Sequence, residues 1–229
     1  MSLIKLKDVS KIYRLGSQEI PALTDLSLTF DAGEFAVLAG PSGSGKTTAL
    51  NLIGCLDRPT TGQVIVSGLD LGTATSRQLA DFRLQHIGFI FQSYNLIPVL
   101  TAAENAEFTL MLQKVPKLLR REKVSQLFAD LGIDGLEDRR PSDLSGGQQQ
   151  RVAIARAMAA DPHVILADEP TANLDSHTAE ELLELMRRLN QEQGTTFIFS
   201  SHDDRVISQA RRVIRLEDGY LANDTMITT

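Results

Sequence analysis

A glycine-rich segment, which we call the phosphate loop (residues 40–47), has the composition needed to bind the phosphates of a nucleotide. It matches the pattern G-x-x-x-x-G-K-[ST], in which glycines let backbone N–H groups surround phosphate oxygens. Lys46 can reach the β- and γ-phosphates, and the Thr47 hydroxyl can bind the Mg²⁺ between them. The alternative is a flexible serine-glycine turn. We predict ATP and Mg²⁺ as ligands, contacted by Gly40, Pro41, Ser42, Gly43, Ser44, Gly45, Lys46, Thr47 and Thr48.

Two adjacent carboxylates could carry out hydrolysis. Asp168 and Glu169 directly follow the apolar run 164–167, as at the end of a buried parallel strand. Adjacent side chains on a strand point apart, so one can hold a metal ion while the other contacts the attacking water. We assign Asp168 to Mg²⁺ and Glu169 to the general base. Alone, such a pair is more often an ordinary acidic strand end, but the nearby phosphate loop favours catalysis.

Two further polar residues also follow predicted strands. His202 comes after the strand at 196–199 and the two serines that follow it, and it could reach a γ-phosphate. Gln92 closes the strand at 87–91, and its amide oxygen could complete the metal shell or sense the nucleotide. Taken alone, each is more often incidental. With the phosphate loop, the predicted catalytic set is Lys46, Gln92, Glu169 and His202, and the predicted metal set is Thr47, Gln92 and Asp168.

The elements that would position these residues alternate along the chain. A buried strand at 35–39 enters the phosphate loop, and helical spacing follows it from 49 to 56. Residues 101–160 are predicted to be helical, opening on the capping box Thr101–Glu104. Strands and helices then alternate to residue 216. We predict an α/β fold with one domain over 1–229, in which 1–91 and 161–229 form the core and 92–160 form an inserted helical lobe.

Composition limits the other function classes. The net charge of −6 argues against a general nucleic-acid binder, which needs clustered lysine and arginine. No apolar run approaches the roughly 20 residues that cross a bilayer, so we expect a cytoplasmic protein. The single cysteine, Cys55, lies in an apolar pattern and is predicted to be a buried hydrophobic residue rather than a redox or metal group.

The segment Leu144-Ser-Gly-Gly-Gln148 is the most specific motif. With it, the chain resembles the ABC-type ATPase family over essentially its whole length. The resemblance implies a P-loop NTPase core with an N-terminal antiparallel β subdomain and an inserted α-helical subdomain. It further implies that the signature segment (residues 145–148) binds the γ-phosphate of ATP held by an opposite subunit, so that a homodimer is needed. The residues concerned are Ser145, Gly146, Gly147 and Gln148.

The same resemblance implies roles for residues outside the phosphate loop. Gln92 matches the Q-loop, Asp168–Glu169 the Walker B pair, and His202 the switch histidine. Residues 173–175 match the D-loop. Tyr13 matches the aromatic side chain that stacks on adenine.

Within the family, residues 53–60, 91–98 and 104–105 look like the lipoprotein-releasing and macrolide-export branch (LolD/MacB-like). Ala172 and Ser201 depart from that branch's usual glycine and threonine. The resemblance implies integral membrane permease subunits of the LolCE/MacB/FtsX-like type, and a peripheral place on the cytoplasmic face of the inner membrane. A permease helix is expected in a groove beside Gln92, for which we predict a lining of Tyr94, Leu96, Ile97 and Pro98, unless these residues form a buried connection between the lobes.

Three alternatives stay open at this point. The chain could power another ABC importer or exporter. A soluble ABC ATPase of ribosomes or DNA usually carries two cassettes, a long coiled-coil insertion or basic surfaces, and none of these is seen in the sequence. A regulatory module without turnover would be expected to lack Glu169 or His202, and both are present.

Overall fold

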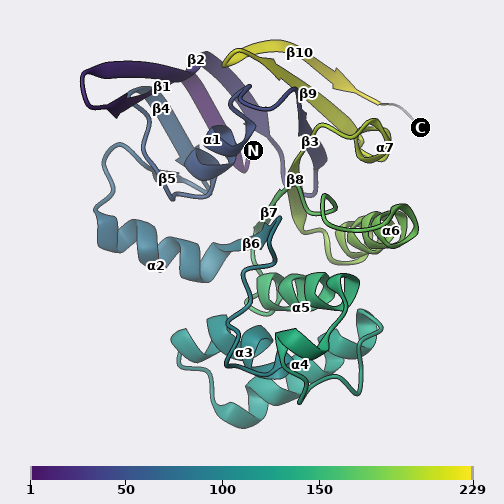
Figure 1. Ribbon diagram of the computed structural model, residues 1–229. Coiled ribbons are helices and arrows are strands. Elements are labelled where there is room, and N and C mark those ends of the chain that lie inside the picture. Colours follow the sequence, from purple (N-terminus) through teal and green to yellow (C-terminus); the bar gives the residue numbers. More distant parts are fainter. Residues whose placement is uncertain (1, 228–229) are drawn as a thin grey trace.

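The computed structural model describes residues 2–227, in which two β-sheets enclose a helix (Figure 1). The smaller sheet is antiparallel, with the strand order β2-β1-β4-β5. This arrangement confirms the predicted antiparallel β subdomain. Its strands are β1 (Ile4–Leu15), β2 (Gln18–Phe30), β4 (Thr61–Val66) and β5 (Leu69–Asp70).

The larger sheet has the order β10-β9-β3-β8-β7-β6, and all its neighbouring strands are parallel except β9 and β10. Parallel strands end at the same edge, so the residues that follow β3, β6, β7 and β8 gather there. The phosphate loop, Gln92, Glu169 and His202 are such residues. The strands are β3 (Phe35–Ala39), β6 (Ile87–Phe91), β7 (Val164–Asp168), β8 (Thr196–Ser201), β9 (Arg212–Glu217) and β10 (Tyr220–Met226).

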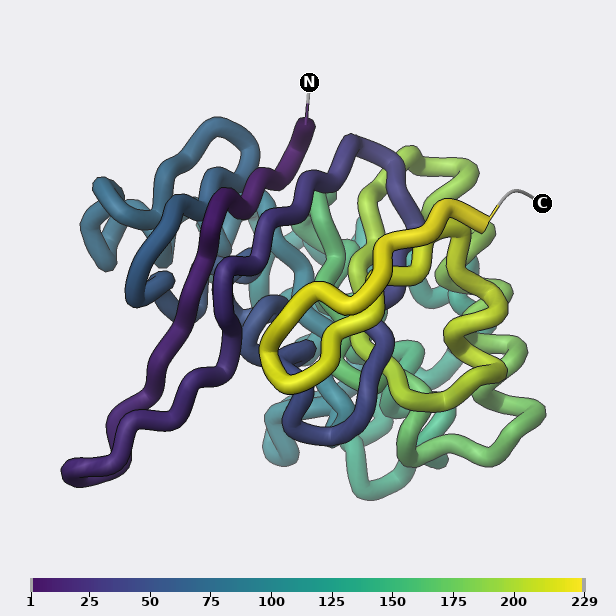
Figure 2. The backbone as a smooth tube through the Cα atoms, turned by 90° about the horizontal axis from the view of Figure 1, so that it is seen from above, coloured from purple at the N-terminus to yellow at the C-terminus, as the bar shows by residue number. Residues whose placement is uncertain are grey.

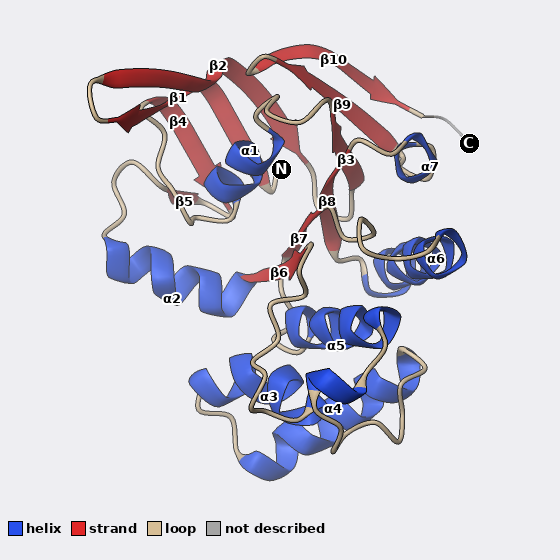
Figure 3. Ribbon diagram, in the orientation of Figure 1, coloured by secondary structure: helices blue, strands red, loops and turns tan. Residues whose placement is uncertain are grey.

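Both faces of the larger sheet are covered, which explains why β3 is apolar at every position. Phe35 and Val37 belong to one buried cluster, whereas Ala36 and Leu38 belong to the other. Helix α1 (Lys46–Ile53) lies between the sheets and packs against β7 and β8. The other face of the larger sheet is covered by helices α5 (Gly146–Met158), α6 (Ser176–Gln193) and α7 (Asp204–Ile207) (Figure 3).

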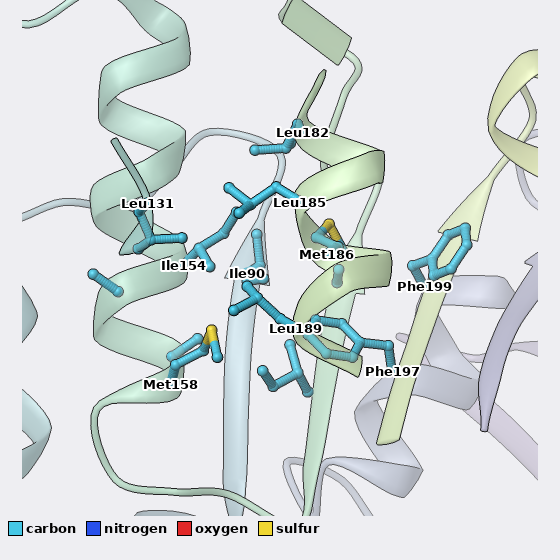
Figure 4. Close-up of a cluster of buried hydrophobic side chains, with 14 of the residues drawn as sticks. Ile90, Leu131, Ile154, Met158, Leu182, Leu185, Met186, Leu189, Phe197 and Phe199 are labelled. Atoms are coloured by element: carbon cyan, nitrogen blue, oxygen red, sulfur yellow. The ribbon is translucent and has the colours of Figure 1, made fainter. Parts of the chain in front are cut away.

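The inserted helical lobe contains α3 (Ala102–Leu112), α4 (Lys117–Asp130), a 3-10 turn (Pro141–Asp143) and α5. Helix α3 opens on the predicted capping box, with both Thr101–Glu104 hydrogen bonds formed. One buried cluster runs without a break from β3 to α4. Figure 4 shows the part of it in which α5 side chains such as Ile154 meet Leu185 and Met186 of α6 and Phe197 of β8.

Three features differ from the sequence-based expectations. Helix α2 (Ser76–His86) was not predicted; its sequence is mostly polar and only Leu79 is buried. Helix α7 ends at Ile207 rather than near residue 210. β1 and β2 are longer than the short strands expected and form a hairpin that extends from the body of the protein (Figure 2), where β10 lies beside β2.

No helix within residues 2–227 has both the length and the apolar character needed to span a membrane.

Candidate active site

The phosphate loop curves tightly because all three of its glycines have positive φ, and the surrounding backbone leaves no space for a side chain at two of them. Gly40 has φ 148° and Gly45 has φ 101°. A Cβ at Gly40 would lie 2.2 Å from the Leu216 carbonyl oxygen, and one at Gly45 would lie 2.6 Å from that of Ala22. Surrounding backbone therefore fixes the loop, and Gly45 serves as the N-cap of α1.

The inner surface of the loop carries a buried cation. Lys46 is 6% exposed, and its Nζ donates hydrogen bonds of 2.8 Å to the carbonyls of Gly40 and Pro41. The Ser44 hydroxyl is also buried and has no hydrogen-bond partner among residues 2–227. The Gly219 N–H donates to the Ser44 carbonyl, so the turn between β9 and β10 supports the loop from behind. The N-terminal end of α1 and Lys46 together favour an anion at this place.

The Walker B carboxylate meets the start of α1. The Thr47 hydroxyl lies 3.1 Å from both oxygens of Asp168. Ser200, buried on β8, donates to Asp168 Oδ1 at 2.5 Å and accepts from the Glu169 N–H at 3.0 Å. One serine thus orients both members of the pair. Sequence reasoning missed it; the only signal was a polar residue directly after the apolar run 197–199.

Glu169 and His202 form a second pair at the same edge of the sheet. His202 Nδ1 lies 2.8 Å from Glu169 Oε1. Strand β7 ends at Asp168, and Glu169 has a left-handed backbone with φ 47°. The two carboxylates therefore diverge because the chain turns between them, not because a straight strand alternates. A non-glycine residue in this conformation is uncommon, and Glu169 is the one that carries a candidate catalytic carboxylate.

Gln92 and Tyr13 lie at the borders of this edge. Gln92 is exposed just beyond β6, and its carbonyl accepts a 2.8 Å hydrogen bond from Asn173 Nδ2. Tyr13 is 38% exposed on β1, and its hydroxyl donates to Asp57 Oδ2 at 3.0 Å. Burial raises the pKa of the Tyr13 phenol. With its hydroxyl held at one end, the ring is positioned as a flat surface on which a base could stack.

The signature segment lies on the other lobe, at the N-terminal end of α5 (Figure 1). Ser145 and Gln148 complete a capping box, with hydrogen bonds of 3.3 and 2.9 Å. Ser145 is exposed and the other three residues are partly exposed. Within residues 2–227, no hydrogen bond joins this segment to the phosphate loop. One chain therefore does not bring the two predicted phosphate-binding segments together.

The residues at this edge fit ATP and Mg²⁺. The loop supplies a buried cation and an unpaired buried hydroxyl at a helix N-terminus, which suits phosphate oxygens. Thr47 and Asp168 supply a hydroxyl and a carboxylate that already converge, and Mg²⁺ prefers oxygen ligands of this kind. Among residues 2–227, no three His, Cys, Asp or Glu side chains are grouped as ligands of a metal ion.

Comparison with known proteins gives the family. The sequence pattern described as "ABC transporter" matches residues 23–172. The chain belongs to the ABC transporter family. Membership confirms the predicted fold class and the prediction that this cassette is an ATP-hydrolysing subunit of ABC type.

Relatives cover the cassette along nearly its full length. An uncharacterised ABC transporter ATP-binding protein of Thermotoga maritima is 46% identical over 219 residues, which are 96% of this chain and 93% of the relative. A macrolide export ATP-binding/permease protein, MacB, of Syntrophobacter fumaroxidans is 47% identical over 223 residues. The cassette spans only 31% of the length of that second relative.

A solved structure is similar over 99% of both chains, with 41% sequence identity and a TM-score of 0.91. It is an ATP-binding cassette of Methanocaldococcus jannaschii in a dimeric, post-hydrolysis state bound to ADP and Pi.

A cavity lies close to the strand that ends before Gln92. It has a volume of about 300 Å³ and lies between α2, β6, α3 and α5. Tyr94, Leu96, Ile97 and Pro98 do not line this cavity. Leu96 is partly buried against the main cluster and Pro98 is exposed, so their place in a permease groove stays a prediction. The side chains that do line the cavity include Leu56, Arg83, Phe89, Phe91, Thr109 and Arg156.

Proposed function

We propose that two copies of this chain close around two ATP molecules and thereby drive a membrane transporter of the LolD/MacB-like branch. The observation that carries this proposal is the position of Glu169. Its carboxylate is paired with His202 at the strand edge that also holds the phosphate loop and Asp168. The complementary signature segment is exposed on the other lobe, where a second copy could reach it.

Each residue would have a distinct role in hydrolysis. The N–H groups of the phosphate loop and Lys46 bind and orient the β- and γ-phosphates. Glu169 accepts a proton from the attacking water, and His202 holds that carboxylate in place. Thr47, Asp168 and Gln92 would hold Mg²⁺, which, when bound, neutralises charge that develops on the phosphate oxygens. Tyr13 would stack against the adenine ring.

Two copies would have to close on each other because the phosphate loop and the signature segment of one chain lie apart. The N-terminal end of α5 offers N–H groups and a positive dipole end, and Gly146 and Gly147 permit close approach of a phosphate. The dimeric state of the related cassette supports this arrangement. ATP would therefore favour the closed pair, since contacts to the γ-phosphate exist only there.

The partner that this cassette drives would be an integral membrane permease. Several relatives join a cassette and a permease in one chain by name. The 300 Å³ cavity between α2 and α3 combines apolar walls such as Phe89 with two arginines, Arg83 and Arg156, which suits a short amphipathic helix. Permease docking there would hold the cassette at the cytoplasmic face of the inner membrane. The same cycle of this cassette would power lipoprotein release, export or force transmission.

Replacement of Glu169 by glutamine tests the hydrolytic role. We expect Glu169→Gln to bind ATP, to accumulate as a dimer in size-exclusion chromatography, and to release phosphate about 10²- to 10⁴-fold more slowly, because the base is lost. Glu217→Gln, at the exposed end of β9 in the same sheet, serves as the control and should keep the normal rate. Normal turnover by Glu169→Gln would remove this residue from the mechanism.

Mixed subunits test the shared site. Ser145→Arg obstructs one phosphate-binding segment and Lys46→Ala disables the other, so each variant alone should be inactive. Mixing them places one intact pair of segments in each heterodimer. We expect phosphate release to return to a fraction of the normal rate, up to one half per dimer. If every mixing ratio stays inactive while both variants remain folded, the two-copy site is wrong.

A further inference from the structure

The end of α3, the start of α4 and the turn between them, which together we call the lobe tip (residues 111–121), expose an unusual number of apolar side chains. Leu118 is 83% exposed, and Met111, Leu112 and Leu119 are each about half exposed. A single exposed leucine is ordinary in a folded protein, but four large apolar residues within nine positions form a patch that calls for a partner.

The fold itself does not use these side chains. Helix α4 packs into the core with Val124, Leu127 and Phe128, which lie on another face of the helix. Lys114 and Val115 donate backbone hydrogen bonds to the end of α3, so the connection is a defined turn. The exposed leucines are therefore held at the lobe surface by ordered structure without contributing to its core.

The lobe tip is also basic, although the chain as a whole is acidic with a net charge of −6. Arg120 pairs with Glu107, and Lys123, just beyond the tip, pairs with Asp161. Three other cations are exposed and form no ion pair in the described part of the chain: Lys114, Lys117 and Arg121. Positive charge and apolar surface thus occupy the same short segment.

The lobe tip lies next to the cavity in which we place the permease. Gln113 Nε2 donates a 2.9 Å hydrogen bond to the Leu84 carbonyl near the end of α2. Leu84 and Thr109 of α3 both line that cavity. In Figure 1 the connection between α3 and α4 is on the same side of the protein as α2. If the permease binds there, the lobe tip faces the bilayer.

We propose that the lobe tip binds directly to a bilayer surface that contains anionic phospholipids. Leu118 and Leu119 would enter the boundary between headgroups and acyl chains, while Lys114, Lys117 and Arg121 would contact headgroup phosphates. The mixture of leucine and unpaired cations favours this occupant over a purely apolar protein surface. The proposal rests on the proposed function only for the direction in which the lobe tip faces; lipid binding itself needs no ATP turnover.

Flotation of the full chain with lipid vesicles tests this proposal. One set of vesicles contains phosphatidylcholine and phosphatidylglycerol at 70:30, and the other contains phosphatidylcholine alone. We expect binding to the anionic vesicles only, weaker at high salt. Leu118→Ser/Leu119→Ser should lower the partition coefficient by about tenfold. Lys114→Gln/Lys117→Gln/Arg121→Gln should lower it on the order of a hundredfold at low salt.

Two controls carry the same changes on surfaces away from the lobe tip. Leu15→Ser alters a leucine that is 73% exposed on the β1–β2 hairpin. Lys7→Gln/Arg211→Gln/Arg215→Gln removes three exposed charges from β1 and the β9 region. Both controls should bind like the unaltered chain, and all variants should keep its phosphate-release rate without vesicles.

Absence of binding to anionic vesicles would overturn the proposal and would indicate a protein partner for the lobe tip. Equal loss of binding in the charge control would also overturn it, because net charge alone would then explain the result. Normal turnover by Glu169→Gln with unchanged flotation would remove Glu169 from the mechanism and leave lipid binding intact, so the two proposals fail separately.

Discussion

The phosphate loop and the signature segment both carry glycines at the start of a helix, but the rest of the chain holds them differently. The phosphate loop is enclosed by the backbone of β2 and β9, and its lysine is buried. A capping box of Ser145 and Gln148 orders the polar groups of the signature segment, which stays partly exposed. One chain alone fixes the shape of the phosphate loop, whereas the signature segment has a surface suited to contact another copy.

The largest effect is expected from Gly40→Ala. The new Cβ would lie 2.2 Å from the Leu216 carbonyl oxygen, in a backbone conformation that alanine adopts with strain. We expect the free energy of unfolding to fall by about 3 kcal/mol, measured by urea denaturation, with loss of ATP binding. Gly43→Ala is the matched control: it has positive φ but open space around its Cβ, and should cost about 1 kcal/mol. Equal costs would show that the loop is not enclosed.

A smaller stability effect but a large functional one is expected from Gly146→Ala. Its Cβ would come closest to the Tyr94 hydroxyl, at 2.8 Å, which is the end of a side chain that can move. Alanine also favours the first turn of a helix, so the unfolding free energy should change by less than about 1 kcal/mol. Phosphate release should fall at least about tenfold because the methyl group obstructs approach of the phosphate. Recovery of activity in Gly146→Ala/Tyr94→Phe would instead assign the loss to a contact within the chain.

The smallest expected effect is the labelling rate of the Cys55 thiol. Cys55 follows α1 and is buried. Burial raises the pKa of its thiol to about 11. At pH 8 an aromatic disulfide reagent should label it only as fast as the protein unfolds, whereas the exposed thiol introduced by Ser145→Cys should react at once.

Because the folded state favours the neutral thiol, this group's contribution to stability is constant below its ordinary pKa. It is then lost as the pH rises through about 11. Rapid labelling of Cys55 in the folded chain would contradict its burial in the cluster at the carboxyl end of α1.

The sequence was most informative where a motif depends on local backbone geometry. Residues 40–47 require a strand before them and a helix after them, and the fold has both. Helix α2 was missed because a helix with one buried residue has no apolar periodicity; its signal was the capping box Thr75–Gln78.

Ser200 and the turn at Glu169 could not be inferred because they depend on which strands are neighbours. Ser200 reaches Asp168 across the pairing of β7 and β8, a contact between residues 32 positions apart. Likewise, the lining of the groove by Arg83 and Thr109 depends on how α2 and α3 lie against β6, which no motif encodes. Such contacts follow from packing of elements that are distant in the sequence.

The two places where the helical lobe joins the core lie on one pair of strands. The chain leaves the core at the carboxyl end of β6 and returns at the amino end of β7, and Phe91 is paired in register with Asp168. The two connections between the lobe and the core therefore lie at opposite ends of the same pair of strands. Asn173 also holds the Gln92 carbonyl, one residue beyond the strand pair that carries the carboxylate assigned to the metal. A movement of the lobe relative to the core would therefore act on Gln92 directly, because this residue is the first of the connection that leaves β6.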